Sequence, residues 1–242
     1  MKPEVTPWRG GWLGADKMNV VYTITWLSGR LLYSTYFRWR VFHPEHVPRT
    51  GPVILAANHA SYMDPPLVGC GLPRTLNYLA RENLFKYPVA GWFLRQLGSV
   101  PVDRDGGGAA GLRAIISRLE AGGVILLFPE GTRTHDGRLQ PARSGIGLTV
   151  IKSTAPVVPV RVFGTYEAYG RHMKLPRPRP IAVKYGVPLL FETLRAEAKT
   201  CTKPRLKEIY QQVANEIMAA IAKLEAVADK APEPTGDSAP VK

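Results

Sequence analysis

The stretch GPVILAANHASYMDPP, residues 51–66, decides the fold. Its first half is a short apolar run, 52–58, of the kind that forms a strand buried on both faces. Its second half places His59 and Asp64 five positions apart, and the two prolines that follow suit the first turn of a helix. Five residues of a regular helix turn through about 140°, so these two side chains cannot share one helical face. The spacing therefore predicts a strand, a turn that carries both residues, and a helix.

His59 and Asp64 do not by themselves name a reaction. An ordinary turn residue at position 59, followed by an aspartate that caps the next helix, explains the same pattern equally well. The rest of the chain has to decide between a structural turn and a catalytic pair.

Short apolar runs alternate with helical patterns over the following residues. Further strands are expected at 75–80, 100–103, 123–128, 155–164 and 180–186. Helices are expected at 83–97, with a break at Pro88, and at 111–121, 147–153 and 203–227. Apolar strands separated by helices predict an α/β fold with a mostly parallel sheet covered by helices on both faces.

The composition narrows the class of protein. A chain of 242 residues, with 45% hydrophobic and 21% charged residues, suits one sizeable globular domain. Two cysteines make neither a disulfide framework nor a metal-ligand pattern. The 32 basic residues exceed the 19 acidic ones and leave a net charge of +13, which favours an anionic partner. That partner is a membrane surface, a phosphorylated substrate or a nucleic acid, and charge alone does not choose among them.

An apolar segment near the N-terminus favours the membrane. Residues 19–37 carry one charge, Arg30, and as a helix they are apolar on opposite sides. A central arginine costs roughly 2.5–3.5 kcal/mol on membrane-insertion scales, which disfavours a full crossing. Four of the five tryptophans lie within the first 40 residues, where their rings suit a headgroup layer. A monotopic helix that lies in the interface is therefore preferred over a spanning or a core helix.

This pattern divides the chain into three parts. Residues 1–43 form a membrane-associating helical segment, 44–229 a catalytic-sized domain, and 230–242 a tail of disordered composition. Because the strand pattern begins at Gly51, a chain that lacks residues 1–43 is expected to fold.

Three polar segments follow predicted strands, where the sites of such sheets form. They contain His59 with Asp64, Asp103 with Arg104, and the run PEGTR from Pro129 to Arg133. Each has a plain alternative as a solvated turn. The glycine-rich run at 106–111 lacks the lysine of a phosphate-binding P-loop and is interpreted as a loop. No metal ligands, dinucleotide loop, base-reading helix or base-stacking platform are recognised, so no cofactor and no nucleic-acid partner are expected.

These segments resemble the glycerolipid acyltransferases. NHASYMD, 58–64, has the form of that superfamily's N-H-x4-D motif, and FPEGTR, 128–133, matches its second hallmark in full. GSVPVDR, 98–104, and APVVPV, 155–160, are similar to two further blocks, and all four occur in the family order. The bacterial 1-acylglycerol-3-phosphate acyltransferases are the most similar group. At 142–145 the family often has a phenylalanine and two basic residues before glycine, whereas this chain retains only Arg143 as a cation.

The chemistry of acyl transfer explains the pair. The acceptor hydroxyl must lose its proton as it attacks a thioester, and a neutral imidazole such as that of His59 is the usual base. Asp64 would orient the imidazole, as the acid does in a catalytic triad, while the substrate's own hydroxyl replaces the serine. Substrate contacts are expected from the residues of the other blocks, with the arginines on the phosphate and Glu130 on a glycerol hydroxyl: Arg104, Glu130, Gly131, Thr132, Arg133 and Arg143.

The resemblance implies an acyltransferase that moves a fatty acyl group from acyl-CoA or acyl-carrier protein to lysophosphatidic acid and forms phosphatidic acid. The enzyme is expected to be monotopic on an anionic membrane surface, at the cytoplasmic face of the inner or plasma membrane. One alternative is another acceptor, either glycerol 3-phosphate or a different lysolipid. An alternative of another class is a non-catalytic basic protein that binds membranes.

Overall fold

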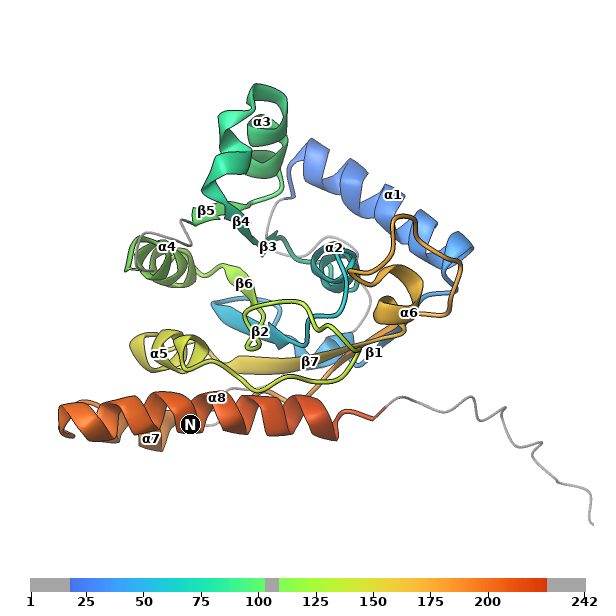
Figure 1. The fold of residues 1–242 in the computed structure, drawn as a ribbon. Coiled ribbons are helices and arrows are strands. Elements are labelled where there is room, and N and C mark those ends of the chain that lie inside the picture. The colour runs from blue at the N-terminus through green and yellow to red at the C-terminus, as the bar shows by residue number, and fades with distance from the viewer. Residues whose placement is uncertain (1–17, 103–108, 226–242) are drawn as a thin grey trace, which may run out of the picture.

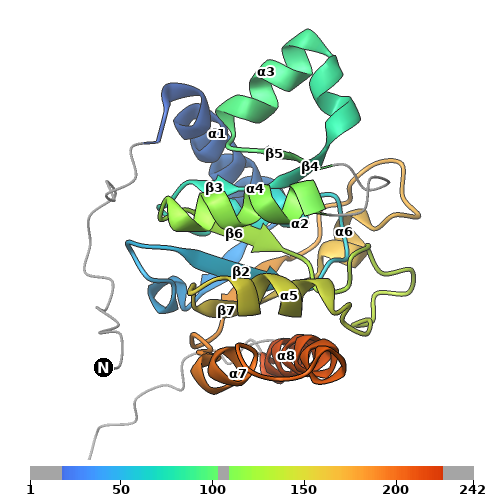
Figure 2. The same ribbon diagram turned by 90° about the vertical axis from the view of Figure 1, so that its left-hand side faces the viewer.

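A computed structural model describes residues 18–102 and 109–225 (Figures 1 and 2). Its main sheet has six strands in the order β1-β8-β7-β2-β6-β3. Their bounds are Arg40–Phe42 (β1), Val53–Ala57 (β2), Leu76–Asn77 (β3), Val124–Leu127 (β6), Val157–Phe163 (β7) and Ala182–Tyr185 (β8). β2 pairs in parallel with β6 and β7, and β3 with β6, whereas β8 is antiparallel to β7. The predicted mostly parallel sheet is confirmed.

The helices follow the expected order along the chain. They are α1 (Val20–Tyr36), η1 (Pro44–His46), α2 (Asp64–Cys70), η2 (Glu82–Lys86), α3 (Pro88–Gln96), α4 (Ala109–Glu120), α5 (Gly145–Lys152), α6 (Thr165–Tyr169), α7 (Glu192–Glu197) and α8 (Lys203–Lys223). The break expected at Pro88 is present, since this residue begins α3 after the short helix η2. Proline suits the first turn of a helix because the amide hydrogen it lacks has no partner there.

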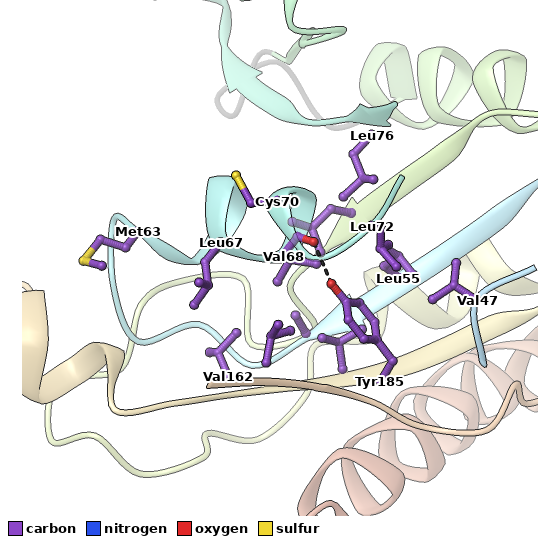
Figure 3. Packing of buried hydrophobic residues seen from close by; sticks show 14 of the residues in the cluster. Val47, Leu55, Met63, Leu67, Val68, Cys70, Leu72, Leu76, Val162 and Tyr185 are labelled. Carbon is purple, nitrogen blue, oxygen red and sulfur yellow. Dashed lines mark hydrogen bonds between the residues drawn. The ribbon is translucent and has the colours of Figure 1, made fainter. Parts of the chain in front are cut away.

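β2 is the central strand, and its side chains alternate between two hydrophobic cores. All five of its residues are buried. Val53, Leu55 and Ala57 belong to the cluster that includes side chains of α1 and α2 (Figure 3). Ile54 and Ala56 belong to the cluster formed with α4, α5 and α8. Helices therefore cover both faces of the sheet, as the continuous apolar run in β2 predicted.

The strand predicted at 100–103 lies outside the main sheet, which differs from the single sheet that was expected. β5 (Val100–Val102) pairs only with β4 (Leu79–Arg81) in a separate two-stranded sheet. The middle residue of β5 is Pro101, which has no amide hydrogen for a ladder and suits an edge strand. The strand predicted at 75–80 is likewise divided between β3 and β4.

α1 has two apolar faces with different environments. Tyr22, Trp26 and Tyr33 are buried in the core cluster on one face of the sheet, and the indole N–H of Trp26 donates to the Leu72 carbonyl at 2.9 Å. The opposite face carries exposed aliphatic side chains: Val20, Ile24, Leu27 and Leu31. The described part of segment 1–43 thus shares a core with the catalytic domain, and β1 adds an edge strand. This packing argues against the expectation that a chain without residues 1–43 folds.

The single charge in α1 is held by the protein rather than presented to lipid. Arg30 is partly buried, and its Nη1 donates to the Cys70 carbonyl at 2.7 Å. Its guanidinium lies 4.7 Å from the ring centroid of Trp26 and 5.2 Å from that of Trp39, in cation–π contacts. The buried Trp26 therefore differs from the expectation that the N-terminal tryptophans lie in a headgroup layer.

Within the described ranges, no helix is long and apolar enough to cross a membrane. The predicted tail at 230–242, the first half of the glycine-rich run, 106–108, and two of the N-terminal tryptophans, Trp8 and Trp12, lie outside the described residues. The second half of that run, 109–111, is the start of α4, so the expectation of a loop is wrong for these three residues.

Candidate active site

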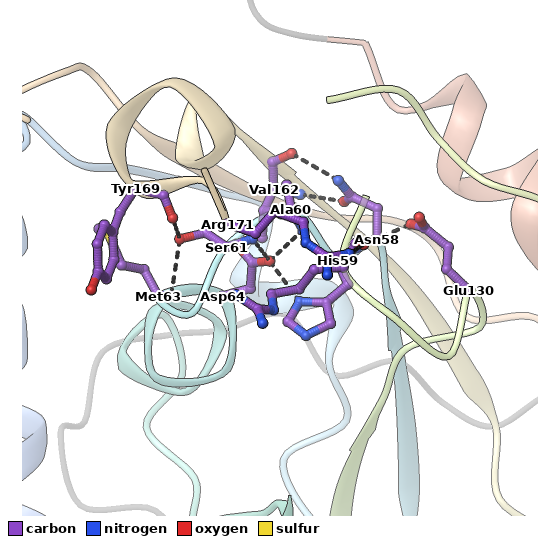
Figure 4. A network of polar contacts seen from close by, with 11 residues as sticks. Asn58, His59, Ala60, Ser61, Met63, Asp64, Glu130, Val162, Tyr169 and Arg171 are labelled. Atoms are coloured by element: carbon purple, nitrogen blue, oxygen red, sulfur yellow. Dashed lines mark hydrogen bonds and ion pairs between the residues drawn. The ribbon is translucent and has the colours of Figure 1, made fainter. Parts of the chain in front are cut away.

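His59 and Asp64 meet in the turn between β2 and α2, as their spacing predicted (Figure 4). His59 Nδ1 lies 2.8 Å from Asp64 Oδ2. The aspartate side chain is fully buried, whereas the imidazole retains 17% of its exposure. A carboxylate only accepts hydrogen bonds, so the contact places the imidazole proton on Nδ1. The unprotonated Nε2 is then free to accept a proton from a substrate.

The backbone of the turn fixes the aspartate. Asp64 Oδ2 also accepts from the amides of Ala60 and Ser61, at 2.6 and 2.7 Å, so three donors converge on one oxygen. The other oxygen, Oδ1, has no hydrogen-bond partner among the described residues. The turn therefore holds the carboxylate in a fixed position behind the imidazole.

Two polar side chains that the sequence did not single out fix the turn to neighbouring elements. Asn58 bridges β2 to β7, because its amide oxygen accepts from the Val162 amide at 2.8 Å and its amide nitrogen donates to the Val162 carbonyl. Ser61 Oγ donates to the Tyr169 carbonyl at 2.6 Å and accepts from the Met63 amide. Both residues lie inside the NHASYMD motif, so their presence there was the available signal.

The segment FPEGTR after β6 encloses His59 from the other side. The Phe128 ring stacks on the imidazole with centroids 3.9 Å apart. The Thr134 amide donates to the His59 carbonyl at 2.8 Å. Because β2 and β6 are parallel neighbours, their carboxyl ends place the two motifs side by side. The site is therefore one unit built from two strand ends.

The Glu130 side chain connects the two motifs by accepting hydrogen bonds from backbone amides. Its Oε1 accepts from the His59 amide at 3.0 Å, and its Oε2 accepts from the Gln140 amide at 3.2 Å. Burial raises the pKa of Glu130 to about 7, and the two amide hydrogen bonds oppose that rise. Both oxygens of Glu130 are hydrogen-bonded to the protein and 3% of its surface is exposed. Glu130 therefore does not fit the expected role of accepting a hydrogen bond from a glycerol hydroxyl.

Gly131 and Arg143 are in contact. Gly131 has a φ of +71°, and a Cβ on it would lie 2.8 Å from Arg143 Cδ. The Arg143 amide donates to the Pro129 carbonyl at 2.9 Å, which places this chain segment beside the FPEGTR turn. The left-handed backbone of the turn thus favours glycine, and the arginine side chain lies over it.

Arg133 is the basic residue of the FPEGTR segment. Its guanidinium carbon lies 3.4 Å from the ring centroid of Tyr62, which belongs to the NHASYMD turn. One terminal nitrogen, Nη1, is buried and has no hydrogen-bond partner among the described residues. An unsatisfied buried guanidinium nitrogen is suited to an anionic ligand.

A further arginine, Arg171, lies beside this group and was not foreseen from the sequence. Its Nη1 donates to the Arg133 carbonyl at 3.3 Å and lies 2.7 Å from His135 Nε2. Arg171 follows α6, far from both motifs in the chain, and no pattern in the sequence connects it to them.

The remaining predicted residues have different outcomes. Thr132 is exposed on the FPEGTR segment, beside Arg133. Arg104 lies outside the described residues, so its contact with phosphate stays a prediction.

The absence of a metal site also stays a prediction. Among the described residues, one group has donors close enough for a metal ion: His43, Glu45 and His46, within 4.8 Å of one another. His43 Nδ1 contacts Glu45 Oε1, and His46 Nδ1 contacts the Tyr185 carbonyl, each at 3.0 Å. These contacts account for the group as a polar turn before β2, whereas the His59 pair follows that strand.

Known proteins are similar to this chain in sequence. The chain is 30% identical over 126 residues to the 1-acyl-sn-glycerol-3-phosphate acyltransferase of Bacillus subtilis, covering 52% of this chain and 62% of that protein. It is 29% identical over 151 residues to the lyso-ornithine lipid O-acyltransferase of Pseudomonas aeruginosa, covering 62% of this chain and 57% of that protein. The chain thus spans less than two thirds of the length of either relative.

A solved structure has the same fold. The crystal structure of the 1-acyl-sn-glycerophosphate (LPA) acyltransferase PlsC from Thermotoga maritima matches with a TM-score of 0.65 at 24% identity, over 85% of this chain and 81% of that chain. The sequence profile of the family described as Acyltransferase matches residues 38–163, half of the chain, and this range contains the His59–Asp64 turn and the FPEGTR segment. This chain is therefore a member of the acyltransferase family.

Proposed function

We propose that this protein transfers a fatty acyl group from acyl-CoA or acyl-carrier protein to the free hydroxyl of lysophosphatidic acid and so forms phosphatidic acid. The observation that carries the proposal is the His59–Asp64 contact, which leaves Nε2 of the imidazole free, in a turn whose Tyr62 ring contacts the Arg133 guanidinium. Membership of the family and the names of several relatives support the same reaction.

The proposed reaction needs one proton to move twice. Nε2 of His59 takes the proton of the acceptor hydroxyl as that oxygen attacks the thioester carbonyl. Asp64 stabilises the imidazolium through Nδ1. The carbon–sulfur bond then breaks, and the proton passes from Nε2 to the leaving thiolate. The ester and a free thiol result, with no change in oxidation state.

The acceptor's phosphate would lie on the basic side of the site. Arg133 offers its unpartnered Nη1, and Arg143 crosses Gly131 nearby. A guanidinium binds phosphate with permanent charge and in a forked geometry. Arg104 stays a candidate for the same role. Glu130 is proposed to position the backbone of His59 rather than to contact the acceptor, because both of its oxygens are engaged.

The outer face of α1 supports attachment to one leaflet of a membrane. Val20 and Leu31 are 74% and 67% exposed on the side opposite the buried aromatic residues. α3 lies beside the start of α1, where Asn19 Nδ2 donates to the Gln96 carbonyl at 2.7 Å (Figure 1). The segment η2–α3 carries further exposed apolar side chains: Leu84, Tyr87, Val89, Trp92 and Phe93. Apolar and aromatic residues of this kind suit an interfacial helix at the cytoplasmic face of the inner or plasma membrane.

A different lysolipid acceptor is the second candidate, because one relative is a lyso-ornithine lipid O-acyltransferase. Thiol release from acyl-CoA by the purified protein separates the candidates. Lysophosphatidic acid should be preferred over glycerol 3-phosphate, lysophosphatidylcholine and lyso-ornithine lipid. A preference for another acceptor would overturn the proposed substrate, and no transfer to any of them from acyl-CoA or acyl-carrier protein would overturn the proposed activity.

A further inference from the structure

A strongly basic loop lies between the active site and α1. The segment RHMKLPRPRP, residues 171–180 and here called the basic loop, connects α6 to β8. It contains four permanent cations, and the chain has no acidic residue between Glu167 and Glu192. Every residue of the loop except Met173 is exposed. The positive charge is therefore presented to solvent without compensating carboxylates in its own segment.

The base of the loop is attached to the catalytic turn. Ser61 Oγ donates to the Tyr169 carbonyl at 2.6 Å. The backbone of Ser61 also pairs with that of Gly170, the residue before the loop, in an isolated antiparallel β-bridge. Arg171, the first residue of the loop, donates to the Arg133 carbonyl at 3.3 Å. The position of the loop is thus coupled to the residues that surround His59.

The other side of the loop lies against α1. The Tyr36 hydroxyl, in the last turn of α1, donates to the Pro176 carbonyl at 3.4 Å, and Figure 1 shows the loop rising beside this end of the helix. Leu175 is 77% exposed and lies between Lys174 and Arg177 in the chain. The loop therefore lies against the end of α1 and presents an exposed leucine between cations of its own segment.

We infer that the basic loop binds the headgroups of anionic lipids and inserts Leu175 at the bilayer surface, so that the active site faces the membrane next to α1. Basic residues close to an anionic leaflet are attracted by its surface potential. The alternation of proline with arginine at 176–180 restricts the backbone, which lowers the entropy lost on docking. An acidic protein surface would also attract the cations, but the exposed leucine and the contact of the loop with α1, whose outer face carries exposed aliphatic side chains, favour lipid. The inference rests on the proposed function, since it names the surface at which that site works.

The test removes charge from the loop without touching Arg171, which contacts the active site. The loop variant combines Lys174→Ala, Arg177→Ala and Arg179→Ala. The matched control combines Lys203→Ala, Lys207→Ala and Lys223→Ala, three exposed cations of α8 beyond the opposite face of the sheet (Figure 2). Both variants lose three positive charges. Binding is measured by sedimentation with vesicles of phosphatidylcholine alone and of phosphatidylcholine mixed with phosphatidylglycerol.

Each cation near an anionic surface contributes about fivefold to binding, so the loop variant should bind the mixed vesicles on the order of 100-fold more weakly at low salt. The control should bind them nearly as wild type does, and both variants should bind phosphatidylcholine alone as wild type does. Equal losses in both variants would overturn the inference, as would an unchanged loop variant. Intact vesicle binding with a raised KM for acyl-carrier protein would overturn it in favour of a protein partner.

The vesicle measurements need no turnover, so they remain informative if the proposed acyl transfer fails. Conversely, thiol release with lysophosphatidic acid can succeed in detergent even if the loop does not bind lipid.

Discussion

Glu130 accepts a hydrogen bond at 3.0 Å from the backbone amide of His59, a residue 71 positions earlier in the chain. The contact joins the two motifs of the family into one structural unit at the ends of β2 and β6. Through this hydrogen bond the glutamate fixes the backbone that carries the proposed base.

Substitution of Glu130 tests this positioning role. The side chain in Glu130→Gln has one acceptor oxygen for the two amides of His59 and Gln140, and its NH2 group faces the other amide, so kcat should fall while KM for either substrate changes little. Glu120→Gln, an exposed change on α4, serves as the control and should behave as wild type does. A rise in KM for the acceptor with an unchanged kcat would instead indicate direct contact with the substrate.

The raised pKa of Glu130 also predicts how stability depends on pH. A carboxyl whose folded pKa is about 7 binds more protons in the folded than in the unfolded chain between roughly pH 4.5 and 7. Its contribution to the free energy of unfolding therefore falls as pH rises through that window. The stability advantage of wild type over Glu130→Gln should shrink between pH 5 and 8 in urea titrations. An advantage that grows with pH would contradict the assignment.

The contact between Gly131 and Arg143 predicts non-additive mutations. Gly131→Ala should destabilise the protein, because the new Cβ meets the arginine side chain and the left-handed backbone costs about 1–2 kcal/mol. In the background of Arg143→Ala the collision disappears, and only the backbone cost should remain. A double-mutant cycle by urea unfolding measures the difference. Strictly additive effects would show that the arginine does not crowd the glycine.

Arg133 is expected to act on the phosphate of the acceptor. Arg133→Ala should raise KM for lysophosphatidic acid about 10–100-fold, the usual effect of losing a charged hydrogen bond, and leave KM for acyl-CoA nearly unchanged. Arg133→Lys should restore part of the loss, because an ammonium lacks the fork. Arg138→Ala, an exposed change in the same loop, is the control. Equal losses toward both substrates would indicate a structural role.

Substitutions on the two faces of α1 should affect different properties, stability on the buried face and membrane binding on the exposed face. Trp26→Ala should lower the free energy of unfolding by about 3–5 kcal/mol, because the indole is buried and bonded to Leu72. Leu27→Ser with Leu31→Ser should leave stability unchanged and weaken vesicle binding. The matched pair Val187→Ser and Leu190→Ser, exposed elsewhere, should affect neither property. Loss of stability in the Leu27 and Leu31 variant would show that this face packs on the protein.

The sequence predicted those features that depend on periodicity and on short motifs. Continuous burial of 53–57 followed from an apolar run without alternation, and the turn followed from a spacing that no helix face can satisfy. The helix at 18–37 was predicted to be apolar on two sides, but which side meets the protein depends on α2 and the sheet. No local pattern contains that information.

Long-range contacts explain what the sequence did not predict. The engagement of Glu130 by two backbone amides requires the relative placement of β2 and β6, and Arg171 reaches the site only because α6 ends beside the catalytic turn. Likewise, the short strand at 100–102 has a strand's composition, yet it pairs with β4 outside the main sheet. Pairing partners are properties of the folded chain.

The most direct measurement is the turnover of His59→Ala, followed as thiol release from acyl-CoA with lysophosphatidic acid as the acceptor. If Nε2 of His59 removes the proton of the hydroxyl, kcat should fall roughly 10²–10⁴-fold. The protein should remain folded, since the imidazole lies at a strand end and retains part of its exposure. A folded variant that keeps nearly full turnover would contradict the account, because no proton transfer at His59 would then be needed.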